Sequence, residues 1–184
     1  YVDCGGRCVS LKSDENCGAC GNACGDGAVC SEEGFCVVKE CTLEDGDYAA
    51  VKVGDKTVKA YCIRDIANFK EVRSSINLGQ PYPDSNNTDN AYILMKNISL
   101  GEQASWAGMG TEAKPFTGYY FGNGKTVSGK LTCASDYCGI IGYAKSSLMR
   151  DFNLDVTVTQ SGNRNYIGGF AGYTEDSKIS NMTI

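Results

Sequence analysis

The chain has 184 residues, a formal net charge of -5 and a pI near 4.8. This acidic balance argues against nucleic acid or an anionic membrane as the main partner. Histidine is absent, which removes the commonest general base and the commonest metal ligand. The sequence also contains no apolar run long enough to cross a membrane.

The first 41 residues hold eight of the 11 cysteines. Such a short, polar, glycine-rich segment cannot fold on a hydrophobic core without crosslinks, so it predicts structural disulfides and an oxidising, extracellular location. The odd total leaves one cysteine without a partner or bonded to another subunit, and spacing does not determine the pairs. The cysteines predicted to form disulfides are Cys4, Cys8, Cys17, Cys20, Cys24, Cys30, Cys36, Cys41, Cys62, Cys133 and Cys138.

Other chemistries fit this segment less well. The pair Cys17 and Cys20 has redox spacing, but no strand precedes it and no amphipathic helix follows. Zinc would require separated thiolate pairs in a reducing cell. A calcium site in Asp45–Asp47 or Asp14–Asn16 lacks the ligand count of a calcium loop. We therefore predict no metal and no cofactor.

From Cys4 to Cys36 the pattern C-G-x-x-C-V…D-x-N-C-G-x-C-G-x-x-C…C…G-x-C resembles a cysteine-rich repeat of secreted bacterial proteins. In that family a further cysteine often lies just upstream of the position of Cys4, and this chain lacks it. The departure accounts for the odd number of cysteines. We expect a disulfide-rich module over residues 1–40.

Residues 41–62 predict a β-hairpin connector. Two alternating segments flank Gly54-Asp55, a dipeptide typical of a tight turn. Cys41 and Cys62 lie at the two ends of this hairpin, where a disulfide would join them.

Residues 65–78 predict an amphipathic helix. Ile66, Phe69, Val72 and Ile76 fall on one helical face, and Gly79 marks its end. We expect Asp65 to act as the N-cap and the helix to cap one end of the domain that follows.

The remaining chain repeats itself. The segment 148–154 matches 94–100 and 178–184, and 125–131 is a looser copy. The glycine-containing segment 139–143 matches 169–173 at a shift of 30 residues. Self-similarity at this period predicts a β-solenoid, in which each short strand buries its apolar face on the next copy.

Particular residues have expected roles in such a stack. Phe152 and Leu154 should point inward, and burying Met149 as well requires a bulge near Arg150 or Asp151. The polar positions equivalent to Asp151 suit a ladder of side chains that bind turn backbone; these are Asn97, Asp151 and Asn181. The run FGNGKTVSGK at 121–130 lacks the spacing of a phosphate-binding loop, so we expect its glycines to form a corner.

Residues 63–184 resemble the GLUG-repeat surface proteins of bacteria. Gly139–Gly142 and Gly169–Gly172 occupy the places of the family's tetrapeptide, although Ile141 and Ala171 are not the usual residues and Cys133 and Cys138 are extra. The other matching motifs are N-x-G at 77–79, I-x-L at 98–100, W-x-x-x-G at 106–110 and F-x-G-x-x-x-G-x-G-K-T-V-x-G at 116–129. The resemblance implies a right-handed β-helix or β-solenoid, mostly β, with an N-terminal capping helix beside the small disulfide-rich module. The chain stops inside a repeat, so we expect this solenoid over 63–184 to be truncated at its C-terminal end.

Candidate sites are few. Acidic residues are scattered without the paired arrangement of a glycoside-cleaving site, so an enzyme is not expected. Three sequons predict glycosylation, at Asn86, Asn97 and Asn181. Tyrosines in predicted turns suit either recognition of sugars or protein surfaces or packing on the corner glycines; these are Tyr119, Tyr120, Tyr143 and Tyr173.

These observations predict a secreted, non-enzymatic, structural or adhesin-like protein of the cell surface. Its expected partners are further copies or repeats of itself and surface glycans or proteins. Two other classes stay open: a filament subunit that stacks head to tail, and a polysaccharide-acting enzyme.

Overall fold

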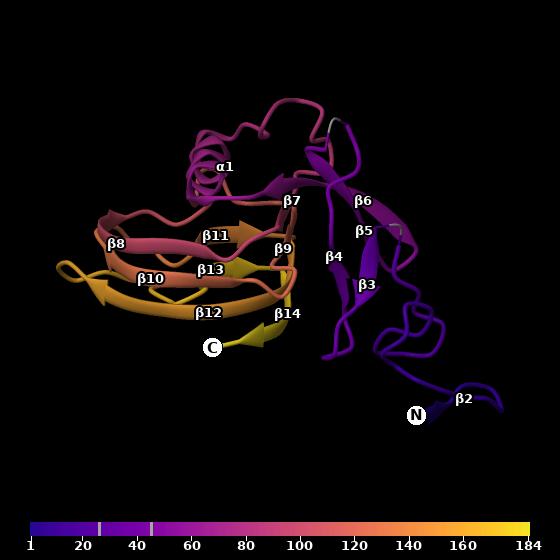
Figure 1. Cartoon of the computed structure of the whole chain (residues 1–184). Coiled ribbons are helices and arrows are strands. Elements are labelled where there is room, and N and C mark those ends of the chain that lie inside the picture. Colours follow the sequence, from indigo (N-terminus) through magenta and orange to yellow (C-terminus); the bar gives the residue numbers. More distant parts are fainter. Residues whose placement is uncertain (26, 45) are drawn as a thin grey trace. The chain divides into compact units, whose positions relative to one another are not determined.

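Figure 1 shows the computed structural model of the chain; the structure describes residues 1–25, 27–44 and 46–184. The chain divides into two compact units, Tyr1–Cys62 and Ile63–Ile184. The described residues are mostly β, with one short helix. They contain no helix with the length and hydropathy of a membrane span.

The first unit consists of three antiparallel strand pairs. The predicted hairpin is confirmed, with Gly54 at φ 59° in its turn. The other two pairs are short, so their segments depend on crosslinks for order. The strands are β1 (Val2–Asp3) with β2 (Cys8–Val9), β3 (Ala28–Cys30) with β4 (Cys36–Val38), and β5 (Tyr48–Val53) with β6 (Lys56–Ile63).

The second unit contains the helix and the parallel strands. Its elements are α1 (Ile66–Leu78), β7 (Ala91–Leu94), β8 (Ile98–Trp106), β9 (Tyr119–Phe121), β10 (Thr126–Cys133), β11 (Ile141–Lys145), β12 (Leu148–Gln160), β13 (Ala171–Glu175) and β14 (Lys178–Thr183).

The expected right-handed β-solenoid is wrong. The largest sheet is mixed and has eight strands. Its antiparallel part is the hairpin β5–β6, and its parallel part has the order β7-β9-β12-β10-β8, with β14 also beside β12. Separate two-stranded sheets complete the fold. The long strand β12 explains the order, because it pairs with β9 through its first residues and with β10 through its later ones.

Part of the repeat nevertheless predicts local pairing correctly. At the shift of 30 residues β11 pairs with β13, Tyr143 opposite Tyr173, and β12 pairs with β14, Met149 opposite Ile179. The match of 94–100 to 148–154 is out of register. Val127 of β10 pairs with both Leu154 of β12 and Ile98 of β8, so Leu154 aligns with Ile98 and not with Leu100.

The buried face of β12 has the predicted composition. Met149, Phe152 and Leu154 are all buried. The backbone irregularity that this requires falls at Asp151, whose φ is 66°. Aromatic rings continue the core, with Phe152 4.9 Å from Tyr120 and 5.1 Å from Phe170, measured between ring centroids.

The predicted helix is confirmed, but its role as an N-terminal cap is wrong. The Asp65 side chain accepts a hydrogen bond from the Asn68 backbone N–H, and Gly79 ends the helix at φ 72°. Helix α1 packs beside β8, where Asn77 accepts a 2.7 Å hydrogen bond from Gly110 N–H. These contacts place it on the flank of the sheet.

The glycines of 121–130 serve two purposes. Gly124 has φ 67° and follows Asn123 at φ 55°, so these two residues form the corner. Gly122 is needed for space, because a Cβ there would lie 2.3 Å from the Asp151 carbonyl oxygen.

Candidate functional site

Four tyrosines gather at the surface of the second unit, and we call them the tyrosine surface: Tyr137, Tyr143, Tyr166 and Tyr173. Parallel pairing of β11 with β13 places Tyr143 opposite Tyr173, with ring centroids 4.7 Å apart. The bridge between Cys138 and Ile167 similarly brings Tyr137 onto Tyr166, whose rings are parallel at 4.8 Å.

The rings also contact each other across the two pairs. Tyr137 lies 5.2 Å from Tyr143, and Tyr166 lies 5.4 Å from Tyr173, both edge to face. Tyr166 is 51% exposed, so half of this residue is open to solvent. The result is one continuous aromatic surface with an accessible ring.

Charged and polar groups border the tyrosine surface. Glu175 accepts a 3.2 Å hydrogen bond from the Tyr143 hydroxyl and forms a 2.6 Å ion pair with Lys145. Asp136 accepts hydrogen bonds from the backbone N–H and the side-chain amide of Asn165. These groups are therefore oriented by the same repeat that aligns the rings.

The border groups hold defined protonation states. Partial dehydration, followed by the hydrogen bond to Glu175, raises the pKa of Tyr143 to about 12. The hydrogen bond from Lys145 lowers the pKa of Glu175, and the Asn165 backbone N–H lowers the pKa of Asp136. At neutral pH the site thus presents the neutral Tyr143 phenol beside the Glu175 and Asp136 carboxylates.

Sequence reasoning found only half of this surface. Tyr143 and Tyr173 belong to it, but Tyr120 is buried in the core and Tyr119 stacks on Phe121 at 6.1 Å. Tyr137 and Tyr166 were missed. Their separation of 29 residues, close to the repeat period, was the signal that could have found them.

Several carboxyl groups act electrostatically on the tyrosine surface. Glu112 and Glu175 both act on Tyr143, and their charges raise its pKa. Asp151 has a raised pKa because of burial, but it lies inside the β12–β14 pairing and accepts a hydrogen bond from Asn181. Among the described carboxyl groups with a resolved shift, only Asp151 has a pKa raised above its ordinary value.

The cysteines form five disulfides, and Cys8 is an exposed free thiol. Cys17 and Cys20, the pair with redox spacing, bond to different partners. The bonds are Cys4–Cys20, Cys17–Cys30, Cys24–Cys36, Cys41–Cys62 and Cys133–Cys138.

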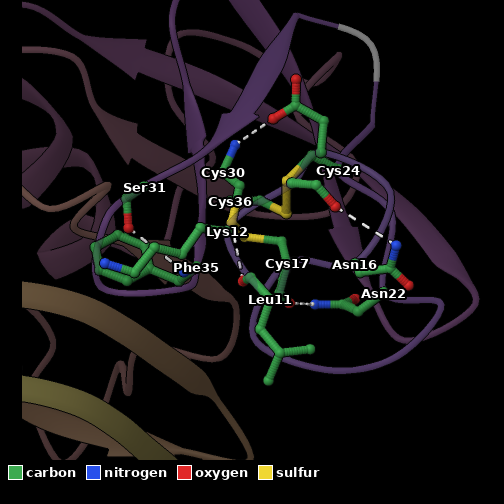
Figure 2. The surroundings of a disulfide bond; sticks show 12 residues. Leu11, Lys12, Asn16, Cys17, Asn22, Cys24, Cys30, Ser31, Phe35 and Cys36 are labelled. Atoms are coloured by element: carbon green, nitrogen blue, oxygen red, sulfur yellow. Dashed lines mark hydrogen bonds between the residues drawn. A yellow bond between two sulfur atoms is a disulfide. The ribbon is translucent and has the colours of Figure 1, made fainter. Parts of the chain in front are cut away.

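Two of these bonds pack together at the centre of the module, as Figure 2 shows. The sulfur atoms of Cys17, Cys24 and Cys36 lie within 4.8 Å of one another. Each is bonded to another sulfur, so none is a thiolate that could ligate zinc.

The turns around these disulfides use the side chains considered for calcium. Asp14 accepts a 2.6 Å hydrogen bond from Cys30 N–H, and Asn16 accepts one of 2.8 Å from Gly21 N–H. These oxygens organise the loop. In the second candidate, Asp45–Asp47, the first residue lies outside the described residues.

The three sequons lie in different settings. Asn86 is exposed in the loop between α1 and β7. Asn97 accepts a 3.0 Å hydrogen bond from Thr126 N–H, a backbone contact of the expected kind. Ile98 aligns with Leu154 through Val127, however, so Asn97 is in register with Asn153 and not with Asp151. Asn181 donates to Asp151 at 2.8 Å. Asn123, whose amide donates to the Leu94 carbonyl at 3.1 Å, takes the place expected for Asn97.

Comparison of the chain with protein-family models, with curated proteins and with solved structures finds no match. The likeness to GLUG-repeat surface proteins therefore stays a prediction from sequence motifs.

Proposed function

We propose that this chain is an extracellular, non-enzymatic, adhesin-like module that binds surface glycans at the tyrosine surface. The observation that carries the proposal is the aromatic surface itself, in which Tyr166 is half exposed and contacts Tyr173, while Glu175 accepts a hydrogen bond from Tyr143. No covalent step is required, because adhesion depends on contact alone.

The chemistry of the site suits a sugar. The C–H faces of a pyranose pack on aromatic rings, while its hydroxyls exchange hydrogen bonds with carboxylates and amides. Tyr166 and Tyr173 offer the rings. Glu175, Lys145 and Asn165 offer acceptors and donors at their edge.

An extracellular location is supported by the disulfides. Five bonds in one chain are compatible with an oxidising compartment, where such bonds persist. The resemblance to bacterial surface repeats points the same way.

The proposal is tested by measuring binding of the purified chain to an array of cell-surface polysaccharides and oligosaccharides. Tyr166→Asn and Tyr173→Ala should each weaken binding about tenfold, the effect of about 1.4 kcal/mol. Asparagine is chosen at 166 because φ there is 56°, a backbone conformation that asparagine tolerates.

Tyr1→Ala is the matched control, since Tyr1 is 96% exposed and lies outside the tyrosine surface. It should bind like the unmodified chain. The proposal fails if the unmodified chain binds no glycan on the array, or if all three variants bind equally well.

A second candidate function is self-assembly. It is favoured by strand β14, which pairs with β12 through residues 178–183 and lies at an edge of the described strands. An exposed strand edge is a template for pairing with another chain.

A further inference from the structure

A loop of the segment that precedes β11 in the stack borders the tyrosine surface. Tyr143 bonds to this segment through both of its backbone groups. Its N–H donates to the Gly110 carbonyl at 3.1 Å, and its carbonyl accepts from Phe116 N–H at 2.9 Å. Gly110 and Phe116 therefore lie on either side of Tyr143, and the intervening residues 111–115 form a loop beside it.

This loop brings an acidic residue to the rings. Glu112 is exposed within it. Partial dehydration is the largest cause of the raised pKa of Tyr137 and of Tyr143, and the charge of Glu112 raises both pKa values further. The backbone pairing and the electrostatics therefore agree on the place of Glu112.

Negative charge outweighs positive charge around the rings. The carboxyl groups that act on the tyrosine surface or on its border are Glu112, Asp136, Glu175 and Asp176, and the cations are Lys145 and Arg164. Lys145 is held by Glu175 at 2.6 Å. Among the described residues, Glu112 and Asp136 form no ion pair with a cationic side chain.

The rings add to this attraction for a cation. The face of an aromatic ring is the negative part of its quadrupole, so it attracts a cation placed within about 6 Å of the ring centroid. Tyr137 lies 5.2 Å from Tyr143 and 4.8 Å from Tyr166, so a group bound at one ring also lies near its neighbours. A carboxylate bound in the same place would be repelled.

From this arrangement of rings and charges we infer that the glycans bound at the tyrosine surface contain amino sugars whose amino groups are unacetylated and positively charged. The inference rests on the proposed glycan-binding function and names the class of sugar. The ammonium group lies over the rings near Glu112 and Asp136. The C–H face of the pyranose packs on Tyr166.

Isothermal titration calorimetry compares two oligosaccharides of equal length, one of glucosamine and one of N-acetylglucosamine. In a mildly acidic buffer the amino groups of the first are protonated, whereas the second is neutral. The glucosamine oligomer should bind about tenfold more tightly. Added salt should reduce this preference, because it screens exposed charges.

Glu112→Gln tests the local charge without changing a ring. It should weaken binding of the glucosamine oligomer about threefold, with a smaller loss for the neutral oligomer. Glu102→Gln is the matched control. It removes the same charge from an exposed residue that pairs with Lys130 at 3.4 Å and acts on neither Tyr137 nor Tyr143. It should leave both affinities unchanged, and circular dichroism checks that both variants are folded.

Several outcomes would overturn the inference while leaving the proposed function in place. These are equal or tighter binding of the N-acetylglucosamine oligomer, tighter binding of a glucuronic acid oligomer, and equal effects of Glu112→Gln and Glu102→Gln. Tighter binding of an oligolysine peptide would assign the surface to a cationic protein segment instead. If the chain binds no saccharide at all, the proposed function itself fails.

Discussion

The Tyr143 hydroxyl donates a 3.2 Å hydrogen bond to Oε2 of Glu175, a residue of the next repeat. The contact exists because β11 and β13 pair in parallel with Lys145 opposite Glu175. The parallel register of β11 and β13 therefore determines which charged group lies beside Tyr143 in the tyrosine surface.

Glu175→Gln should lower the pKa of Tyr143 from about 12 towards its ordinary value. The negative charge of Glu175 stabilises the protonated phenol, and the substitution removes that charge, while dehydration remains. The pKa is measured by nuclear magnetic resonance with ¹³C-labelled tyrosine. Glu102→Gln, on exposed Glu102 of β8, is the control and should leave this pKa unchanged; an unshifted resonance in Glu175→Gln would contradict the assigned contact.

Tyr120→Phe should stabilise the fold by roughly 1 kcal/mol. The Tyr120 hydroxyl is buried and finds no hydrogen-bond partner among the described residues, so its removal eliminates a desolvation cost. Tyr92→Phe is the matched control. The Tyr92 hydroxyl bonds to Asn90 at 2.9 Å, and its loss should destabilise by about 1 kcal/mol. Urea denaturation distinguishes the two, and an equal loss of stability in both would show that the Tyr120 hydroxyl has a partner.

Asp151→Asn should raise stability at neutral pH by roughly 1 kcal/mol. Burial raises the pKa of Asp151, so the folded chain binds its proton more tightly than the unfolded chain does. The charged carboxylate is therefore destabilising above the folded pKa, and this cost disappears as the pH falls through that pKa. Asparagine keeps an oxygen for Asn181 and tolerates the φ of 66°.

The stability gain of Asp151→Asn should accordingly shrink in acid, as measured by thermal melts from pH 7 down to pH 4. Asp155→Asn, on the exposed side of β12, should change stability little at any pH. A gain that grows as the pH falls would reverse the sign argued here.

Gly122→Ala should destabilise the fold by about 1–3 kcal/mol or more, as overpacked cores do. The added methyl would meet the Asp151 carbonyl oxygen at 2.3 Å and the Phe152 Cα at 2.6 Å, and backbone atoms cannot move aside. Gly169→Ala is the control, because a Cβ there would meet only the Val156 side chain, at an ordinary contact distance of 3.6 Å. Chemical denaturation should show a clear loss for the first variant only.

Thiol titration with Ellman's reagent in denaturant should find one free thiol per chain, and Cys8→Ser should have none. The five disulfides use all other cysteines. Peptide mapping after alkylation identifies the labelled residue. Alkylation at Cys4 or Cys20 in place of Cys8 would mean that the first bond is assigned incorrectly.

Local features of this chain could be predicted because each depends on neighbouring residues. The helix at Ile66–Leu78 follows from its apolar spacing, its Asp65 cap and the stop at Gly79. The hairpin follows from alternation around Gly54. The pairing of β11 with β13 follows from a 30-residue match without a gap.

The whole sheet could not be predicted in the same way. Copies of a motif with different spacings do not reveal which strand lies between which others. Val127 of β10 pairs with Leu154 on one side and with Ile98 on the other, so Leu154 and Ile98 are aligned. The sequence match between 94–100 and 148–154 instead suggests that Leu154 aligns with Leu100. One long strand that pairs with β9, β10 and β14 then decides the order.

By itself the sequence determined the elements, the need for crosslinks and the local register of the last repeat, because chain-neighbour sterics, hydrophobic periodicity and short-range matches act over few residues. Only the tertiary structure decided the mixed sheet, the flank position of α1, the free Cys8 and the convergence of Tyr137 and Tyr166 with Tyr143 and Tyr173. Those features depend on contacts between residues far apart in the chain, where many pairings share the same local propensities and packing selects one.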